Sequence, residues 1–480
     1  MASDPGMMTH RLAALRAFNR WPVSEVDRFG RALDAKEDWA LFRINPVCFA
    51  EREGFDEQVA LDLFVHGVKV GLFDLVWTCL CVFCGAVEYA FDTIDRIPTR
   101  DFHCTRCDAD IRAWLDERVE VCFSIHPSVA TLAIDPFRDW ACYQRYYTSS
   151  NLLRPPVEAA SHRIHAHLLL EAEASGELEF DLAAGDSLRL VSYDRHAQAL
   201  LSSEAGAPAS LDVDLLPTGF ATTAACAPGR VVLRVNNRAS TPTGVVVLDG
   251  DVARFRHSVE TQPAALRPFV SGQKLLCTES FRRLFRVQSL DEELALNVRH
   301  VALLFTDLVA STALYEVVGD VAAYARVRAH FRELHAATEI CGGAVVKTMG
   351  DAIMAAFDST LAAARAGVDI LRRIEALNAT MPPGGTPLAV RIGVHAGPAI
   401  IVHAQGRLDY FGQVANIAAR VQSLAGAASM CLSLDALRMP GVEAALAETS
   451  TIEGPQRVVI RGLSEPIDVY RIELATHARA

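Results

Sequence analysis

Two aspartates in the C-terminal part of the chain have the clearest potential for chemistry. Asp307 follows the apolar run VALLF, and Asp351 follows Gly350 in KTMGDAIMAAF, a segment typical of a β-hairpin. Side chains at the ends of neighbouring strands face a common cleft in open α/β folds. Two carboxylates placed there can bridge a pair of Mg²⁺ ions about 4 Å apart, which activate an attacking oxygen and neutralise a triphosphate. Either aspartate alone is more typical of a turn or a helix cap.

Four cysteines in the N-terminal part have the spacing of a metal site. Cys81 and Cys84 form one C-x2-C pair, Cys104 and Cys107 form a second, and 19 residues separate the pairs. Four thiolates at this spacing suit a closed tetrahedral zinc site, as in a zinc ribbon. We therefore predict one structural Zn²⁺ per chain.

Two residues beside these pairs are alternative ligands. Cys79 alternates with Cys81, which favours the opposite face of an expected strand, and His103 precedes Cys104. Zinc ribbons often bind nucleic acid, but residues 1–126 hold 14 Lys and Arg against 21 Asp and Glu, a balance of −7. Without a basic surface, a structural or protein-contact role fits this module better than nucleic-acid binding.

Five segments follow one another in the last 180 or so residues. They are FTDLVAST at 305–312, VVKTMGDAIMAAF at 345–357, VRIGVHAGPA at 390–399, DYFGQVANIAAR at 409–420 and RGLSEPIDVYRI at 461–472. Together they resemble the catalytic domain of class III adenylate and guanylate cyclases, over residues 298–475. The resemblance implies that Asp307 and Asp351 bind two Mg²⁺ or Mn²⁺ ions in each active site.

The same resemblance assigns Thr306, Ser311 and Thr312 to substrate binding. The backbone amides after Asp307, where the chain enters a helix, are expected to cradle the terminal phosphates. Ala310 stands where the family often has glycine. We expect this small change to leave phosphate binding intact.

Lys347 and Asp409 match the positions that read the base in this family. Lysine donates to the unprotonated N1 of adenine, and aspartate accepts from the exocyclic amino group. Guanine presents an N–H and a carbonyl at these places and mismatches both side chains, at about 1–3 kcal/mol each. The pair therefore predicts ATP as the substrate.

Asn416 and Arg420 lie four residues apart in the helix expected after DYFG, so they project from one helix face. By resemblance Asn416 positions the ribose, and Arg420 stabilises the charge that develops on the α-phosphate. In this family the metal ligands of one chain act with the base and ribose residues of another. A chain that holds all six residues therefore predicts a head-to-tail homodimer with two equivalent sites and an inactive monomer.

The predicted function is an adenylate cyclase that converts ATP to 3′,5′-cyclic AMP and pyrophosphate, with a regulatory N-terminal region. One alternative is a nucleotide-sensing regulator whose cyclase-like domain binds ATP without turnover. Another is a zinc-dependent interaction protein whose N-terminal part is the functional end. The formal charge of −12 argues against a protein that coats nucleic acid.

These side chains need a multidomain α+β scaffold, which we divide into four segments. Residues 1–126 combine helices, with apolar positions at helical spacing up to residue 76, and the zinc-ribbon-like module. Residues 127–263 hold short alternating runs that predict a β-sandwich-like regulatory domain. Residues 264–297 predict a helical connector, and residues 298–475 predict an α/β domain with the ferredoxin-like order βαββαβ. Asp56 is expected to cap the helix that begins after it.

The sequence also bears on location. Leu75–Val87 is the most hydrophobic stretch and is too short to cross a bilayer, and no signal peptide is visible at the start. Because clustered cysteines in a reducing compartment more often bind metal, we expect a soluble, cytoplasmic protein. The first 260 residues loosely resemble the region that precedes the cyclase domain in some bacterial proteins, a resemblance that names no ligand.

Overall fold

The structure is a computed structural model of the 480-residue chain. It describes residues 2–475 except 4, 35, 99–100, 155–163, 222–223, 252, 254–256, 258–260, 262–263, 286–294, 311–315, 317–318, 381–386, 405, 461–462 and 464. The chain divides into two compact units, one of Met1–Ala113 with Glu117–Val270 and one of Trp114–Asp116 with Ser271–Ala480. Each unit is described by itself.

The first unit begins with helices. They are α1 (Pro5–Arg16), α2 (Val23–Asp34), α3 (Pro46–Glu53) and α4 (Glu57–Lys69), with a 3-10 turn at Asp38–Ala40. Asp56 caps α4 by accepting from the amides of Gln58 and Val59, which confirms the predicted cap. The helical prediction up to residue 76 is wrong at its end. Gly71 takes a left-handed conformation after α4, and Phe73 already begins a strand.

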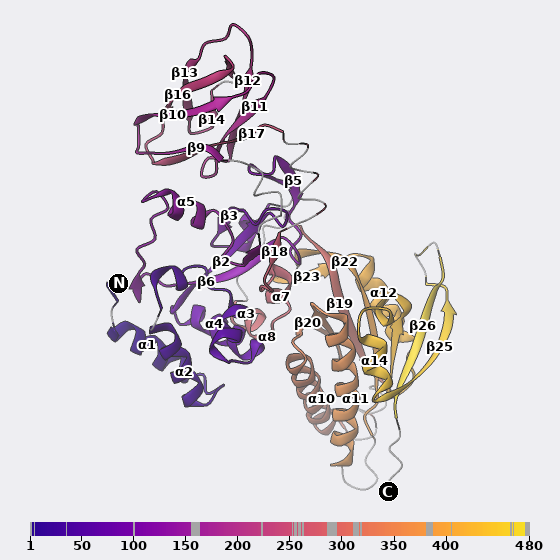
Figure 1. The fold of residues 1–480 in the computed structure, drawn as a ribbon. Helices are drawn as coiled ribbons and strands as arrows, with labels where there is room; N and C mark the ends of the chain where they lie inside the picture. Colours follow the sequence, from indigo (N-terminus) through magenta and orange to yellow (C-terminus); the bar gives the residue numbers. More distant parts are fainter. Residues whose placement is uncertain are drawn as a thin grey trace. The chain divides into compact units, whose positions relative to one another are not determined.

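A three-stranded sheet with the order β3-β2-β6 follows these helices (Figure 1). Its strands are β2 (Phe73–Leu80), β3 (Val87–Phe91) and β6 (Val119–Ile125). The rings of Phe29, Phe64, Phe73 and Phe123 are fully buried and pack the helices against this sheet. Between β3 and β6 lie a 3-10 turn (Ile94–Arg96) and the pair β4 (Asp101–Cys104) and β5 (Ala109–Arg112).

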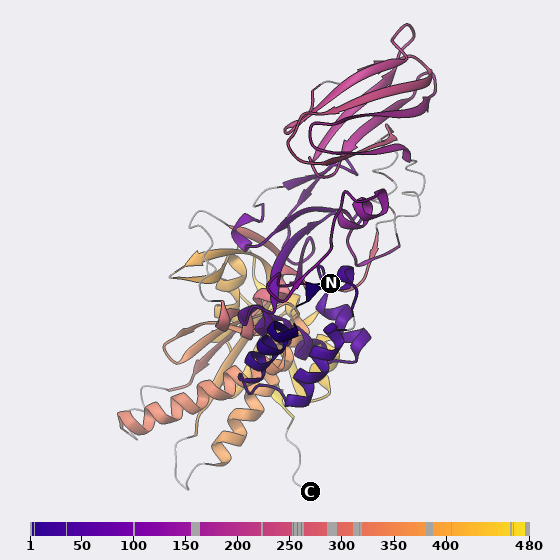
Figure 2. The same ribbon diagram turned by 90° about the vertical axis from the view of Figure 1, so that its left-hand side faces the viewer.

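Residues 164–249 form two sheets over one apolar core, with the orders β10-β16-β13-β14 and β15-β12-β11-β17-β9. The strands are coloured magenta in Figure 2. Their bounds are β9 (Ile164–Leu170), β10 (Ser175–Leu182), β11 (Ser187–Ser192), β12 (Ala197–Ser203), β13 (Ser210–Leu216), β14 (Gly219–Phe220), β15 (Ala224–Cys226), β16 (Gly229–Asn237) and β17 (Thr243–Asp249). The alternating burial of β10 shows why these runs fold as half-buried strands. The remaining elements of this unit are β1 (Ala2–Ser3), β7 (Ala130–Thr131), α5 (Trp140–Tyr146), β8 (Leu152–Arg154) and β18 (Ala265–Leu266).

The second unit opens with the short helices α7 (Gly272–Leu276) and α8 (Glu279–Leu284). The predicted connector helix is wrong at its far end. Leu296 and Val298 already belong to strand β19 (Leu296–Leu308), where both side chains are buried and pair with β22. The segment before Leu296, over residues 286–294, lies outside the described residues.

A single sheet with the order β20-β21-β19-β22-β24-β26-β25 organises this unit, and β23 pairs with β22 at its side. Along the chain, β19, α10, β20, β21, α11 and β22 follow in the order βαββαβ. The bounds are α10 (Asp320–Ile340), β20 (Ala344–Met349), β21 (Ala352–Phe357), α11 (Thr360–Ala379), β22 (Val390–Ala404), β23 (Arg407–Phe411), α12 (Gln413–Ser423), β24 (Ser429–Ser433), α13 (Leu434–Leu437), α14 (Val442–Ala447), β25 (Ser450–Val458) and β26 (Ile467–Leu474).

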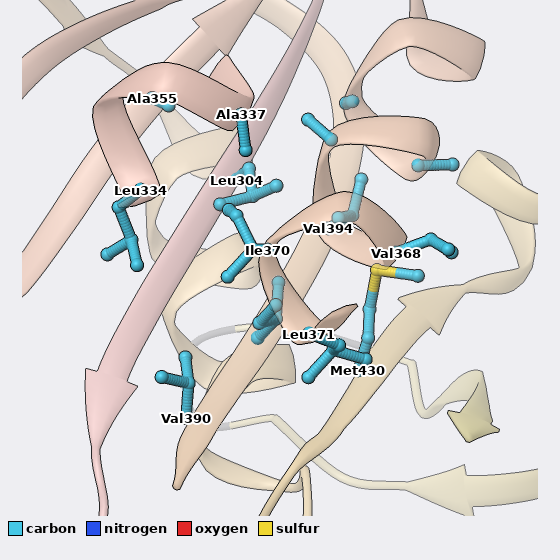
Figure 3. Packing of buried hydrophobic residues seen from close by; sticks show 14 of the residues in the cluster. Leu304, Leu334, Ala337, Ala355, Val368, Ile370, Leu371, Val390, Val394 and Met430 are labelled. Carbon is cyan, nitrogen blue, oxygen red and sulfur yellow. The ribbon is translucent and has the colours of Figure 1, made fainter. Parts of the chain in front are cut away.

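Helices α10 and α11 lie side by side against this sheet, as the orange helices of Figure 1 show. Figure 3 shows Leu304 of β19 pointing into the same core as Ile370 and Leu371 of α11. All three side chains are at most 4% exposed. Because this interior is close-packed, the strands that carry the candidate site are held rigidly.

Candidate active site and cysteine cluster

The two aspartates come to the same end of adjacent strands. Asp307 is the penultimate residue of β19, and Asp351 immediately precedes β21 in a turn that Gly350 makes in a left-handed conformation. β19 and β21 are antiparallel, with Phe305 opposite Met354. This pairing carries both carboxylates to one sheet edge.

The chemistry of this carboxylate pair fits divalent cations. One oxygen of Asp351, Oδ2, is buried and accepts no hydrogen bond within the described part of the chain. A buried carboxylate oxygen without a donor is costly unless a cation binds it. Asp307 is half-buried and forms no ion pair with any described residue. Hard carboxylate oxygens are the ligands that Mg²⁺ and Mn²⁺ prefer.

The segment after Asp307 is described only as far as Ala310. Ser311 and Thr312 lie outside the described residues. Ala310 has φ +55°, the left-handed conformation that costs a residue with a Cβ roughly 1–2 kcal/mol, which explains why glycine suits this place. The hydroxyl of Thr306 is buried and accepts from the amide of Ile353 at 3.0 Å, so this oxygen ties β19 to β21.

Lys347 and Asp409 are 62 residues apart in the chain and form an ion pair. Lys347 Nζ lies 2.5 Å from Asp409 Oδ2, and the amide of Tyr410 donates to Asp409 Oδ1 at 2.8 Å. Lys347 belongs to β20 and Asp409 to β23. The side chains are 36% and 18% exposed, so a planar ligand can still reach both. The structure thus brings together the two residues predicted to read the base.

Asn416 and Arg420 lie on the exposed face of α12. The opposite face buries Val414 and Val421. Both polar side chains form no hydrogen bond or ion pair with other described residues, so they are available to a ligand or a partner chain.

Close contact with β22 positions α12. A Cβ added to Gly393 of β22 would meet the backbone nitrogen of Gln422 at 2.2 Å. Glycine at residue 393 therefore permits the approach of the helix that carries Asn416 and Arg420. The sequence motif shows this glycine but not the reason for it.

The six side chains fall into separate groups within one chain. Lys347 contacts Asp409, and Asn416 shares a helix face with Arg420. No hydrogen bond or ion pair among the described residues joins these four side chains to Asp307 or Asp351.

Sequence reasoning missed a set of contacts from α7 and α8 onto the strands of the ion pair. Glu279 Oε2 accepts from the amide of Val345 in β20 at 2.9 Å. Arg282 Nη1 donates to the carbonyl oxygen of Leu408 in β23 at 2.9 Å. Arg282 also lies over the ring of the buried Tyr410. The only signal in the sequence is the pair of arginines in FRRLF, which reads equally well as a solvated helix face.

A cavity of about 490 Å³ lies beside these contacts, with Lys347, Arg282, Arg283 and His335 in its wall. The α8 helix therefore borders the same space as the lysine of the ion pair. Hydrogen bonds thus join α8 to Val345, two residues before Lys347, and to Leu408, the neighbour of Asp409.

In the first unit, Cys81, Cys84, Cys104 and Cys107 form a buried cluster. Their sulfur atoms all lie within 4.8 Å of one another, and the pairs Cys81–Cys107 and Cys84–Cys104 are each 3.7 Å apart. Four converging buried thiols fit a tetrahedral Zn²⁺.

Neither alternative ligand joins this group. Among the described residues, the group of possible metal ligands within 4.8 Å of one another consists of the four cysteines alone. Cys79 lies on β2 opposite Tyr89, and burial raises the pKa of its thiol to about 12. The ring of His103 contacts the carboxylates of Asp108 and Asp110 instead.

Within the described part of the chain, no helix is both long enough and apolar enough to cross a membrane.

Comparison with known proteins divides the chain in two. Residues 8–283 match a family described as "Family of unknown function (DUF5939)", and residues 295–472 match the "Adenylate and Guanylate cyclase catalytic domain". An adenylate cyclase of Lachancea kluyveri is 34% identical over 170 residues, which cover 31% of this chain and 9% of that protein. A receptor-type adenylate cyclase of Trypanosoma congolense is 28% identical over 207 residues, which cover 36% of this chain and 27% of that protein.

Among solved structures, the adenylate/guanylate cyclase/hydrolase of Silicibacter pomeroyi is 26% identical, with a TM-score of 0.32. The match covers 38% of this chain and 99% of that one. The curated relatives are matched over only 9% and 27% of their lengths. The first matched family covers more than half of this chain. The chain therefore belongs to this family of unknown function, and its residues 295–472 are an adenylate and guanylate cyclase catalytic domain.

Proposed function

We propose that this chain is an adenylate cyclase that converts ATP to 3′,5′-cyclic AMP and pyrophosphate. The observation that carries this proposal is the contact between Lys347 and Asp409, 2.5 Å apart at the edge of a cyclase catalytic domain. A lysine beside an aspartate offers a donor for N1 and an acceptor for the amino group of adenine. With guanine the lysine would face an N–H donor and the aspartate would face a carbonyl acceptor, and neither pair can form a hydrogen bond. Hydrogen bonding therefore favours ATP over GTP.

The residues divide the chemistry between binding and charge stabilisation. Asp307 and Asp351 hold two Mg²⁺ or Mn²⁺ ions, which when bound supply activation of the 3′ hydroxyl and neutralisation of the triphosphate. Asn416 positions the ribose so that its 3′ oxygen lies in line with the α-phosphorus. Arg420 donates to the α-phosphate oxygens, where negative charge grows as pyrophosphate leaves. Thr306, Ser311 and Thr312 belong to the phosphate-binding segment.

The active site is built across a homodimer in this proposal. Support comes from Asn416 and Arg420, which are exposed on α12 and form no hydrogen bond or ion pair through their side chains with the described residues, so both are available to a substrate held by a partner chain. Two such chains related by a two-fold axis form two equivalent sites, each with aspartates from one chain and the other four residues from its partner.

The N-terminal part is regulatory in this proposal. We keep the predicted segments 1–126, 127–263, 264–297 and 298–475, except that the connector ends before strand β19 begins at Leu296. The four buried cysteines bind one structural Zn²⁺ and thereby stabilise the fold of the strands around them. Metal analysis of the purified chain should find one zinc, which Cys104→Ser should lose together with thermal stability. Absence of zinc from the wild type, with four titratable thiols, would contradict the zinc site.

A parallel assay of the purified chain with ATP and GTP, first with Mn²⁺ and then with Mg²⁺, tests the activity. We expect turnover of ATP to exceed that of GTP by about a hundredfold, since two mismatches act together. The double variant Lys347→Glu/Asp409→Asn should reverse the preference, because Glu accepts from guanine N1–H and Asn donates to its carbonyl. Binding of ATP without any turnover would favour the nucleotide-sensing regulator instead.

A further inference from the structure

The first unit contains a cavity of about 330 Å³ that the cyclase chemistry does not use. Its wall comes from the segment around Trp39, from strands β2 and β6, and from the end of α5 with the turn that follows it. Cavities of this size hold small organic ligands when a few polar groups converge on an apolar wall.

Two arginines in this wall have aromatic rings beneath them. The guanidinium of Arg145 lies 4.5 Å from the ring centre of Trp39, and that of Arg43 lies 4.8 Å from Phe42 and 4.6 Å from Tyr146. Within the described residues neither arginine forms an ion pair. Stacking on a ring leaves the N–H groups of a guanidinium available to an anion, and in Arg43 these are the N–H groups other than the one on Nη1 that binds Tyr146.

The position of Arg43 is itself constrained. Its φ is +50°, a left-handed conformation that costs a non-glycine residue roughly 1–3 kcal/mol and persists only where its surroundings enforce it. Its amide donates to Ser124 Oγ at 3.0 Å, and its Nη1 donates to the carbonyl oxygen of Tyr146 at 2.9 Å. These contacts hold the guanidinium against the cavity.

The cavity wall also contains a buried carboxyl group, that of Glu120. Glu120 is 3% exposed, and Asn151 Nδ2 donates to its Oε1 at 2.5 Å. Asn45 in turn donates to Asn151 Oδ1 at 2.8 Å and fixes the direction of that amide. Burial raises the pKa of Glu120 to about 7, so near neutral pH this group both donates and accepts hydrogen bonds.

We propose that this cavity binds a small organic anion whose carboxylate or phosphate lies between Arg43 and Arg145. A polar group at the other end of the ligand hydrogen-bonds to Glu120. Thr148 and Ser149 also line the cavity. Two guanidinium groups that form no ion pair within the described residues face this cavity, and Glu120 is the one acidic residue in its described wall, so the wall favours an anion over a cation. This site is independent of the proposed cyclase activity, and it gives the family of unknown function a ligand class.

Calorimetric titration of the full chain tests the proposal with 4-hydroxybenzoate and 4-hydroxyphenyl phosphate, and with 4-hydroxybenzamide as a neutral control ligand. We expect at least one of the two anions to bind at millimolar concentration or below, and about tenfold or more tighter than the amide. The anion that binds distinguishes a carboxylate site from a phosphate site.

Arg145→Gln should weaken that binding about tenfold or more, because the exposed side chain leaves the fold intact while its charge is lost. Arg234→Gln, which removes an equally exposed arginine from β16, should bind as the wild type does. The proposal is overturned if neither anion binds, if the amide binds as tightly as its anion, or if Arg145→Gln keeps wild-type affinity. The last result would place the anion elsewhere, the nucleotide site included.

Discussion

At the scale of single residues, the charges of Lys347 and Asp409 have a partner within the chain, whereas the carboxylate of Asp351 has an oxygen without a donor among the described residues. Lys347 and Asp409 neutralise each other, so a nucleotide base has to replace their mutual contact with two of its own. Asp351 has a buried oxygen with no donor among the described residues. The proposed base-reading residues thus pair with each other without ligand, whereas we expect a cation to supply the counter-charge of Asp351.

This difference predicts the behaviour of Asp351→Asn. Asp351→Asn removes a half-buried charge whose Oδ2 atom accepts no hydrogen bond among the described residues. The melting temperature of the metal-free protein should stay unchanged or rise, while turnover should fall about a thousandfold or more because a proposed metal ligand is lost. Thermal unfolding in a chelator and cyclic AMP formation measure the two effects. Glu375→Ala, on the exposed face of α11, serves as the control and should alter neither. Near-normal turnover by Asp351→Asn would remove Asp351 from the metal site.

Glu120 gives the N-terminal region a pH dependence. Its pKa is about 7 in the folded chain because of burial, against an ordinary value of 4.5, and Arg43 is the nearby charge that opposes this rise. The folded state therefore binds the extra proton between about pH 4.5 and 7, and stability falls as pH rises through that window. Between pH 5 and pH 8 we expect the wild type to lose about 3 kcal/mol of unfolding free energy through this group.

Denaturant unfolding of Glu120→Gln at the two pH values checks this expectation. Glutamine cannot ionise, so most of the loss should disappear in this variant. Glu177→Gln changes an exposed glutamate of β10 and should keep the wild-type dependence. An undiminished pH dependence in Glu120→Gln would assign the effect to other groups.

At the scale of elements, the motifs predicted which segments carry the site but not how closely they pack. The hairpin over 344–357 and the helix after DYFG were predictable, because their apolar periods and turn residues act locally. The contact of Gly393 with the backbone of α12 was not, since it joins residues 29 apart in the chain. The end of α4 was placed too late because the run after Gly71 is apolar enough for a helix as well as a strand.

The close approach of α12 to β22 predicts that alanine substitutions at two glycines of β22 have different effects on turnover. Gly393→Ala forces its Cβ against the backbone of Gln422 and should displace the helix, lowering turnover about tenfold or more. Gly397→Ala is the matched control, because its Cβ would meet nothing closer than 3.8 Å. Equal activities of the two folded variants would show that the position of α12 does not limit catalysis.

The contacts of α8 predict a role for Arg282 in ATP affinity. Arg282→Ala removes the hydrogen bond to Leu408 beside Asp409, so we expect KM for ATP to rise about tenfold with a smaller change in kcat. Arg328→Ala removes an exposed arginine of α10 outside the wall of the cavity that α8 borders and should behave as the wild type. Steady-state kinetics on both variants decides the matter. An unchanged KM in Arg282→Ala would separate α8 from substrate binding.

At the scale of the whole molecule, the two halves of the chain were unequally predictable. Five ordered motifs predicted a cyclase catalytic domain, and the family match over residues 295–472 confirms that domain, while the roles of its single residues stay predictions. The cavity of about 330 Å³ in the first unit could not be predicted, because its wall gathers residues from Trp39 to Leu152 that share no motif. Ser311 and Thr312 remain sequence predictions, since they lie outside the described residues.

The central claim is that one catalytic site needs residues of two chains. Asp307→Ala removes a metal ligand from both sites of a homodimer, and Arg420→Ala removes the arginine from both, so each variant alone should be nearly inactive. In a mixed dimer one site receives both lesions, and the other combines intact aspartates of one chain with intact Arg420 of its partner.

Co-expression of the two variants, with cyclic AMP formation as the readout and each variant alone as control, is the decisive measurement. Random mixing makes half of the dimers hybrids with one good site of two, so activity should recover to roughly a quarter of the wild-type value. If hybrids form but remain as inactive as their components, the site is not shared between chains, and the proposed dimeric mechanism is wrong.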